Sequence, residues 1–173
     1  MGKLKIRKAQ PEDLPHIKQI AELNSLQNLS QKEAKKQGFL VSGFKTEEYE
    51  DFINRVDHFY VLTIDENIEA FLLAYSSQHI KPYEELNLHI KNNHCSDFIL
   101  SKQIGVNPPK MSQGLATKLY NHLFSLTAPL PTYTVTVMKP INKRSNRFHE
   151  HIGFQKKFKY MPPDGKKRLI WKR

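Results

Sequence analysis

The chain has 173 residues, of which 39% are hydrophobic and 10% aromatic, and this size and composition predict one folded domain over residues 1–173. It has one cysteine, eight scattered histidines and no run of about 18 apolar residues, so we expect no internal disulfide bond, no metal site and no membrane-spanning helix. The formal net charge is +10, and because no apolar leader segment opens the sequence, a cytoplasmic protein is expected.

The first half of the chain predicts alternating strands and helices. A helix is expected at 46–56 because Tyr49, Phe52, Ile53 and Val56 recur at helical spacing. In chain order, the expected elements are a strand at 3–9, a helix at 11–24, an irregular polar segment at 24–45 with a short helix at 31–37, the helix at 46–56, and hairpin strands at 58–64 and 69–75.

The second half opens with a polar segment at 78–96, which is expected to be mainly loop, with irregular helix as the alternative. After it come a strand at 97–106, a helix at 112–126, a strand at 132–138, a helix at 142–153, and closing strands at 154–161 and 167–173. The helix at 112–126 lies between two strands, which predicts a parallel strand pair joined by a crossover helix. Because strands and helices are mixed along the chain, the α/β class is favoured.

The positive charge is concentrated at the end of the chain. Residues 139–173 contain eight lysines and four arginines against Glu150 and Asp164, whereas residues 1–138 contain equal numbers of basic and acidic side chains. One interpretation is a basic surface for an anionic partner, such as nucleotide phosphates, nucleic acid or an acidic protein. The other is a solvated terminal hairpin whose lysines maintain solubility.

A glycine corner joins the strand at 97–106 to the next helix. The first N–H groups of a helix lack intrahelical partners, and the helix dipole adds positive charge there. Gly114 has no side chain, and Ser112 and Ala116 are small, so the N–H groups of residues 112–117 can approach an anion. No G-x-G-x-x-G or G-x-x-x-x-G-K-[ST] motif is present, and an ordinary helix start is the alternative.

The stretch VNPPKMSQGLATKLY, residues 106–120, resembles the acetyl-CoA pyrophosphate loop of the GNAT superfamily of N-acetyltransferases. That loop commonly reads Val-x-Pro-x-x-(Arg/Gln)-x-x-Gly-x-(Gly/Ala). The matching residues are Val106, Pro108, Gly114, Leu115 and Ala116. Met111 stands where the family usually has Arg or Gln, and Ser112 stands where Gly is frequent.

A second stretch, NKRSNRFHEHIGF, resembles the family's later helix, which typically reads Asn-x-x-Ala-x-x-(Leu/Phe)-Tyr-x-x-x-Gly-Phe. The matching residues are Asn142, Phe148, Gly153 and Phe154. The small Ser145 replaces Ala, and His149 replaces the tyrosine. The two motifs and the element order make the resemblance cover nearly the whole chain. It implies a single-domain α/β fold, with a mixed, largely antiparallel sheet flanked by helices and a splayed central strand pair.

The resemblance also implies which residues bind acetyl-CoA. Backbone groups at Ile104, Gly105 and Val106 would meet the pantetheine arm, and Asn142 and Ser145 would flank the cofactor. The pyrophosphate would be held by Ser112, Gln113, Gly114, Leu115, Ala116 and Thr117. Acceptor pockets in the family are lined by the region after the first helix and by the last hairpin, here residues 24–45 and the turn at 161–165.

The implied reaction is transfer of an acetyl group from acetyl-CoA to a primary amine by direct attack through a tetrahedral intermediate. The family often uses the motif tyrosine to protonate the leaving thiolate, and His149 can replace it chemically. The alternatives are that His149 only packs and water donates, or that Tyr160 donates. Four residues are candidates for the general base, none with a distinguishing neighbour: His79, His94, Glu85 and Asp97.

A rival hypothesis is a non-catalytic basic module that contacts nucleic acid or the ribosome through residues 139–173. An acetyltransferase acting on an acidic or nucleic-acid-bound acceptor combines the two hypotheses. The acceptor itself, a small molecule or a protein, is not specified by the sequence.

Overall fold

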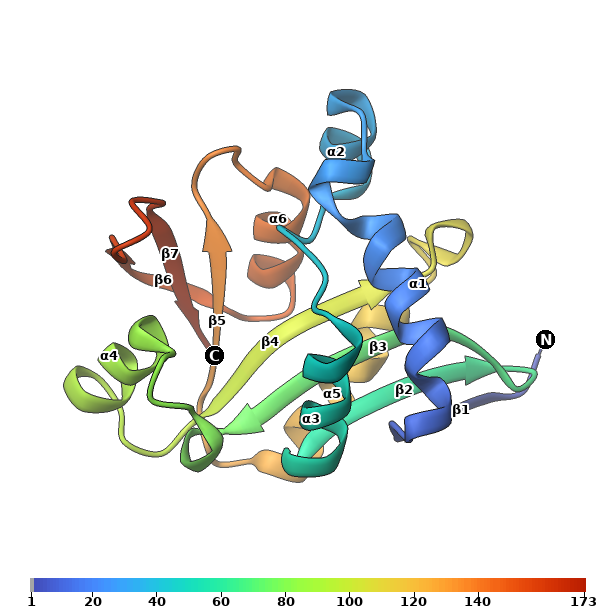
Figure 1. Ribbon diagram of the computed structural model, residues 1–173, viewed down its shortest axis with the longest axis horizontal. Helices are drawn as coiled ribbons and strands as arrows, with labels where there is room; N and C mark the ends of the chain where they lie inside the picture. Colours follow the sequence, from blue (N-terminus) through green and yellow to red (C-terminus); the bar gives the residue numbers. More distant parts are fainter. Residues whose placement is uncertain (1) are drawn as a thin grey trace.

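The computed structural model of the protein describes residues 2–173 (Figure 1). The strands of the described chain are β1 (Leu4–Lys8), β2 (His58–Ile64), β3 (Asn67–Ser76), β4 (Ile99–Val106), β5 (Thr132–Val137), β6 (Gln155–Tyr160) and β7 (Arg168–Lys172). The α-helices are α1 (Leu14–Asn24), α2 (Gln31–Gln37), α3 (Thr46–Arg55), α4 (Glu85–Asn93), α5 (Leu115–Thr127) and α6 (Lys143–His151). A 3₁₀ turn, η4 (Pro108–Lys110), lies between β4 and the glycine corner.

The strands form one sheet in the order β1-β2-β3-β4-β5-β7-β6. Every neighbouring pair is antiparallel except β4 and β5, which are parallel and joined by α5. This parallel pairing is short, because it runs only from Ile99↔Thr132 to Ser101↔Thr134. Beyond Ser101 the two strands separate, and Figure 1 shows β5 turning away from β4. The predicted fold class, including the splayed central pair, is confirmed.

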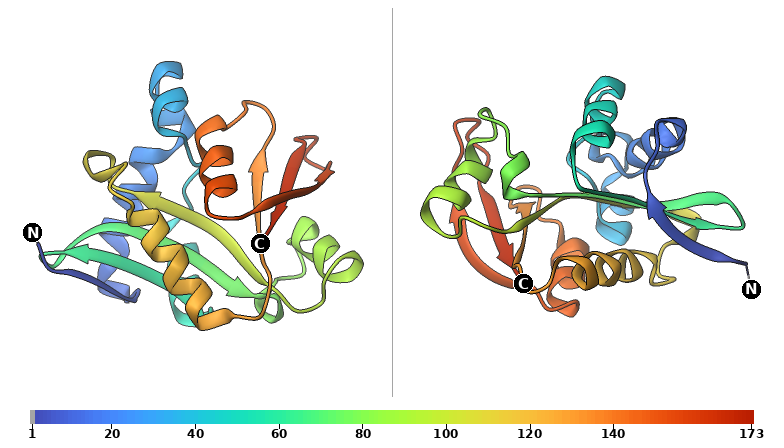
Figure 2. Two further views of the ribbon diagram at one scale, coloured as in Figure 1. Left: turned by 180° about the vertical axis from the view of Figure 1, so that it is seen from behind. Right: turned by 90° about the horizontal axis from the view of Figure 1, so that it is seen from below.

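Helices cover both faces of the sheet and give it two hydrophobic cores. On one face α1 and α3 contribute Ile17, Ile20, Tyr49 and Phe52 to the core. On the other face α5 contributes Leu115, Leu119 and Leu123 to the second core. Figure 2 shows the sheet edge-on between these two layers. Burial on both faces explains why β3 is an almost continuous apolar run and not an alternating one.

The expectation that residues 78–96 are mainly loop is correct only in part, because residues 85–93 form α4, a regular helix. Its apolar residues Leu86, Leu88 and Ile90 are spaced by two, which is not a helical pattern. The helix is instead anchored at its start by Glu84, whose carboxylate accepts hydrogen bonds from the Lys81 N–H and, within the first turn, from Asn87 Nδ2. No helix within residues 2–173 is long and apolar enough to cross a membrane.

Candidate active site

The separation of β4 from β5 opens a wedge in the sheet, and two clefts adjoin it. The corner cleft, of about 650 Å³, is bordered by the glycine corner, the end of α2 and the first turns of α6. The hairpin cleft, of about 560 Å³, is bordered by the start of α4, by β4 and β5, and by the β6–β7 turn. Five residues line both clefts, which therefore meet at the wedge: Phe39, Leu40, Ile104, Asn142 and Ser145.

The glycine corner has the backbone geometry of an anion site. Gly114 has φ +75° and ψ 14°, and Ser112 also has a positive φ, of 68°. Within residues 2–173, no protein acceptor takes a hydrogen bond from the N–H groups of residues 112–117, and Gly114 caps α5 without a side chain. A Cβ built on Gly114 meets no atom within 4 Å. Free donors thus stand beside open space at a helix start.

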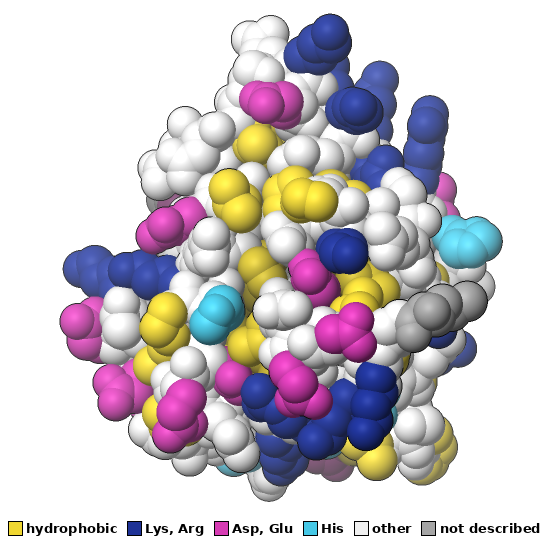
Figure 3. All heavy atoms as spheres, turned by 90° about the vertical axis from the view of Figure 1, so that its right-hand side faces the viewer, with side chains coloured by type: hydrophobic (Ala, Val, Ile, Leu, Met, Phe, Trp, Pro, Cys, Tyr) yellow, Lys and Arg dark blue, Asp and Glu magenta, His cyan; other side chains and the backbone are white. Residues whose placement is uncertain are grey.

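Basic side chains surround this corner. Six of them line the corner cleft: Lys35, Lys36, Lys110, Lys143, Arg144 and Arg147. Among the described residues that line this cleft, none is acidic. In Figure 3, Lys and Arg side chains crowd the upper right of the molecule, at the height where α2 lies in Figure 1. Arg144 also fixes the corner, since its guanidinium donates to Ser112 Oγ at 3.0 Å and to Lys36 O at 3.1 Å.

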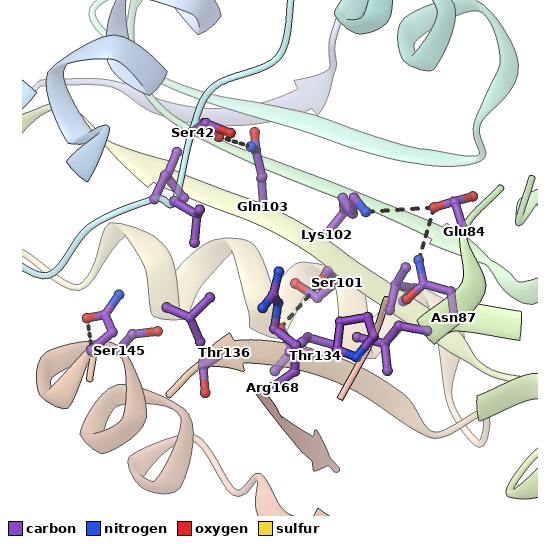
Figure 4. A pocket seen from close by; sticks show the side chains of 18 of the residues that line it. Ser42, Glu84, Asn87, Ser101, Lys102, Gln103, Thr134, Thr136, Ser145 and Arg168 are labelled. Carbon is purple, nitrogen blue, oxygen red and sulfur yellow. Dashed lines mark hydrogen bonds and ion pairs between the residues drawn. The ribbon is translucent and has the colours of Figure 1, made fainter. Parts of the chain in front are cut away.

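The bridge segment, residues 38–44, contributes to the walls of both clefts and is fixed at two points. Asn142 Nδ2 donates to Phe39 O at 2.7 Å, and Gln103 Nε2 donates to Ser42 O at 3.0 Å (Figure 4). Gln103 is itself held, because its Oε1 accepts from the buried Tyr49 hydroxyl at 2.9 Å. The segment is therefore attached to β4 on one side of the wedge and to α6 on the other.

The hairpin cleft contains a buried carboxylate and a lysine that sequence reasoning missed. The Glu84 side chain is 7% exposed, and its Oε1 lies 3.7 Å from Lys102 Nζ (Figure 4). Burial lowers the pKa of Lys102, and the carboxylate of Glu84 opposes that effect. The hairpin cleft also carries Arg168, which is paired with Asp164 at 2.7 Å. Charges of both signs thus face the same space.

His149 is buried in a chain of hydrogen-bonding groups at the side of the wedge. Its Nδ1 lies 3.3 Å from Ser145 Oγ, and its Nε2 lies 3.3 Å from the Tyr120 hydroxyl. That hydroxyl lies 2.7 Å from Ser101 Oγ on β4. Burial lowers the pKa of His149 to about 4 and raises the pKa of Tyr120 to about 12. The imidazole and the phenol are therefore both neutral at pH 7.

No protein-family model and no curated protein matches the sequence. Solved structures do match it over nearly its whole length. Ard1 from Thermoplasma volcanium is 14% identical and superposes with a TM-score of 0.70, covering 98% of this chain and 96% of that one. A GNAT-family acetyltransferase from Streptococcus agalactiae 2603 is 18% identical, with a TM-score of 0.70 and coverage of 98% and 94%. Arabidopsis thaliana Naa50, in complex with the bisubstrate analogue CoA-Ac-MVNAL, is 11% identical, with a TM-score of 0.65 and coverage of 98% of both chains.

The chain has the GNAT fold. At these identities the likeness establishes the arrangement of the elements, and the predicted resemblance to the GNAT superfamily is confirmed at that level. The two stretches that carried the prediction lie side by side in the structure. One is the glycine corner before α5, the other is α6, and Arg144 of α6 bonds directly to Ser112 of the corner.

The GNAT fold brings most of the predicted cofactor residues to the corner cleft. Its lining includes Ile104, Val106, Ser112, Gly114, Leu115, Ala116, Thr117, Asn142 and Ser145. Gly105 and Gln113 do not line it; Gly105 packs against Phe71 and Gln113 is exposed. Asn142 is buried and engaged in protein contacts, because its Oδ1 also accepts from the Ser145 N–H at 3.2 Å.

The predicted acceptor regions also meet in this GNAT fold. The bridge segment lies within the predicted range 24–45, and Pro162, Pro163 and Asp164 of the predicted turn face it across the hairpin cleft. Of the four candidate bases, Glu85 lines this cleft. His79 lies 3.7 Å from Asp57, and His94 stacks on Phe158. Asp97 is exposed, and Tyr160, which lies on β6, packs near His89. Neither cleft is lined by His79, His94, Asp97 or Tyr160.

Proposed function

We propose that residues 1–173 form a single acetyl-CoA-dependent N-acetyltransferase domain that transfers an acetyl group to a primary amine. The observation that carries the proposal is the corner cleft, where free N–H groups and six basic side chains adjoin the wedge. This donor set fits coenzyme A, whose diphosphate and 3′-phosphate are anionic while its pantetheine arm is polar and extended. Acetyl-CoA would therefore bind from the corner side, and the acceptor amine from the hairpin side.

The chemistry that the residues must perform is proton transfer on both sides of the wedge. The amine nitrogen forms a bond to the acetyl carbon, the carbon–sulfur bond breaks, and CoA leaves as a thiol. The attacking amine must be neutral, so its ammonium form first loses a proton. Glu84 and Glu85 are the carboxylates at the start of α4 that line the hairpin cleft, and we propose that one of them receives this proton.

We further propose that the proton for the thiolate comes through the chain of Ser145, His149 and Tyr120. A histidine with a pKa of about 4 is a neutral imidazole at pH 7, so it has one N–H to donate and one nitrogen to accept. Ser145 lines both clefts, and its hydroxyl lies 3.3 Å from His149. Ser145 would then face the sulfur and give it a proton, and His149 would return a proton to Ser145. The second proton of the amine nitrogen, released as the intermediate collapses, would restore the chain.

The acceptor is proposed to be an amine on a small molecule or a protein. The hairpin cleft is lined by several segments that are far apart in the sequence, and two of its apolar lining residues are exposed: Val41 at 48% and Tyr83 at 76%. The Naa50 structure contains a bisubstrate analogue, which documents one kind of acceptor for that protein. An acidic or nucleic-acid-associated acceptor is compatible with the lysines of β6.

A non-catalytic basic module is not favoured by the comparisons, because the similar structures are acetyltransferases. Part of the basic C-terminal charge belongs to the two clefts: Lys143, Arg144 and Arg147 line one, and Arg168 lines the other. The rest is Lys139 between β5 and α6, three lysines of β6, Lys166 and Lys167 of the turn that follows it, and Lys172 and Arg173 at the chain end.

The test is thermal unfolding with acetyl-CoA, with free CoA and with ATP. A ligand at about 100 times its Kd stabilises by about 2.7 kcal/mol, which for a chain of this size raises Tm by about 5–10 °C. We expect that shift with acetyl-CoA and with CoA, and a smaller one with ATP. A Tm that does not move with millimolar acetyl-CoA would contradict the proposal.

Gly114→Glu tests the corner directly, and Gly165→Glu is its matched control. Both glycines have positive φ, of 75° and 71°, and a Cβ on either meets no atom within 4 Å. The two variants should therefore lose similar stability, about 1–2 kcal/mol, from backbone strain. Only Gly114→Glu puts a carboxylate in the corner, so it alone should lose the Tm shift with acetyl-CoA. Equal shifts in both variants would refute the assignment of the corner.

A further inference from the structure

Lys102 places an amine inside the hairpin cleft at the point where β4 and β5 separate. The last residue of β4 that pairs with β5 is Ser101, and Lys102 follows it. On the other side of β4, Gln103 pairs with Leu73 and Ser101 pairs with Ala74, so Lys102 is the extra residue of a β-bulge. Bulges redirect side chains and are frequent next to active sites. In Figure 4, Lys102 lies beside Ser101 and Gln103 on the strand that walls the cleft.

The surroundings of this amine suit it to react. Its Nζ lies 3.7 Å from Glu84 Oε1 and 5.9 Å from the centre of the Phe44 ring, and its side chain is 30% exposed. The charged groups that act on it are Glu84 and Glu48, which favour the ammonium, and Arg168, which opposes it. Burial outweighs the carboxylates and lowers the pKa of Lys102, so more of it is neutral than of a free lysine. A neutral amine is the nucleophile that a thioester requires.

Among the described residues that line the hairpin cleft, Lys102 is the one lysine. The lysines of the corner cleft, such as Lys110, lie at the proposed phosphate end of the cofactor. We propose that Lys102 is an internal acetyl acceptor, which the enzyme acetylates when no external amine occupies the hairpin cleft. This inference rests on the proposed function, since the acetyl group comes from acetyl-CoA.

The step balances with groups already named. The Lys102 ammonium first gives one proton to Glu84, from which it passes to water. The neutral nitrogen then forms a bond to the acetyl carbon, and the carbon–sulfur bond of acetyl-CoA breaks. The second proton leaves the nitrogen as the intermediate collapses and ends on the CoA sulfur. The products are Nε-acetyl-Lys102 and CoA.

Acetylation of Lys102 would change the hairpin cleft in two ways. The positive charge disappears, which ends the ion pair with Glu84 and the cation–π contact with Phe44. The added acetyl group also occupies space that an acceptor needs. The modified protein should therefore still bind acetyl-CoA but transfer acetyl to external amines more slowly.

The experiment is incubation of the 173-residue chain with acetyl-CoA alone, followed by intact mass measurement and peptide mapping. We expect Lys102 to gain acetyl at an initial rate at least about tenfold above that of Lys110, which serves as the internal reference. Lys102→Arg keeps the charge but cannot accept acetyl, so this variant should show no fast phase and an unchanged Tm shift with acetyl-CoA. Gly114→Glu should lose the fast phase while its Lys102 stays intact.

Three results would overturn the inference, and they separate it from the proposed function. If acetyl-CoA raises Tm but Lys102 reacts no faster than Lys110, the inference fails and the proposed function stands. If Gly114→Glu is acetylated at Lys102 as fast as wild type, the reaction is chemical and not enzymatic, and the inference again fails. If acetyl-CoA neither binds nor modifies the protein, both fail together.

Discussion

The burial of His149 makes a measurable prediction about stability and pH. The native pKa of His149 is about 4, and the unfolded chain should have the ordinary value near 6.5. Between these values the unfolded state binds more protons than the native state, so the free energy of unfolding falls as pH falls. For a single group with these two pKa values, the loss between pH 7 and pH 4.5 is about 2 kcal/mol.

The assay is urea unfolding of wild type and His149→Gln at several pH values from 7 to 4.5. Glutamine does not titrate, and the carboxylates are common to both proteins, so the difference between the two unfolding free energies isolates His149. We expect that difference to move by about 2 kcal/mol in favour of the variant as pH falls. His151→Gln, on the exposed side of the same helix, is the control and should show no such trend. A pH-independent difference for His149→Gln would refute the neutral, buried imidazole and the proton chain built on it.

Two further variants test the walls of the wedge. Asn142→Ala removes the donor to Phe39 O and the cap of α6, so it should lower the free energy of unfolding by about 2 kcal/mol. The control is Asn146→Ala, which should lower it less, because Asn146 Oδ1 has no hydrogen-bond partner within residues 2–173. Equal losses of unfolding free energy in the two variants would contradict the role of Asn142 in holding Phe39 and capping α6. Gly105→Ala puts a Cβ 2.6 Å from Phe71 Cε1 in a packed core, so denaturant unfolding should show a loss of about 1–3 kcal/mol; wild-type stability would argue against this close approach.

The elements that were predicted well are those whose signals are local. α2 occupies residues 31–37 as expected, because Ser30 and Glu33 form a capping box at its start. β2 occupies residues 58–64 as expected, because an apolar β-branched and aromatic run is bounded by polar residues. α4 was not delimited, because what anchors it is the buried Glu84, whose partners include the Tyr75 hydroxyl from β3. No local pattern marks that contact.

The candidate site shows the same contrast between local signals and long-range contacts. The glycine corner could be predicted because its residues are consecutive in the sequence and resemble a loop motif of a known family. The ion pair of Lys102 with Glu84 was missed, because it depends on a β-bulge and on a helix that local spacing did not predict. Asn24, which lines the corner cleft, was not predicted as a site residue for a similar reason. Its buried amide donates to Val106 O, 82 residues away along the chain. The roles assigned to His149 and to the cofactor residues stay predictions until the variants are measured.

The bridge segment has a consequence for attempts to redesign this protein. Acceptor preference in such a scaffold would ordinarily be altered by exchanging the loop that faces the acceptor. Here that loop also forms a wall of the corner cleft, and its carbonyls at Phe39 and Ser42 are bound by α6 and β4. A transplanted loop must therefore reproduce both attachments, or it will disturb the cofactor side as well. Under the proposed function, selection for a new acceptor would therefore be constrained by retention of the cofactor. Variation should be tolerated best at Val41, which lines the hairpin cleft and not the corner cleft.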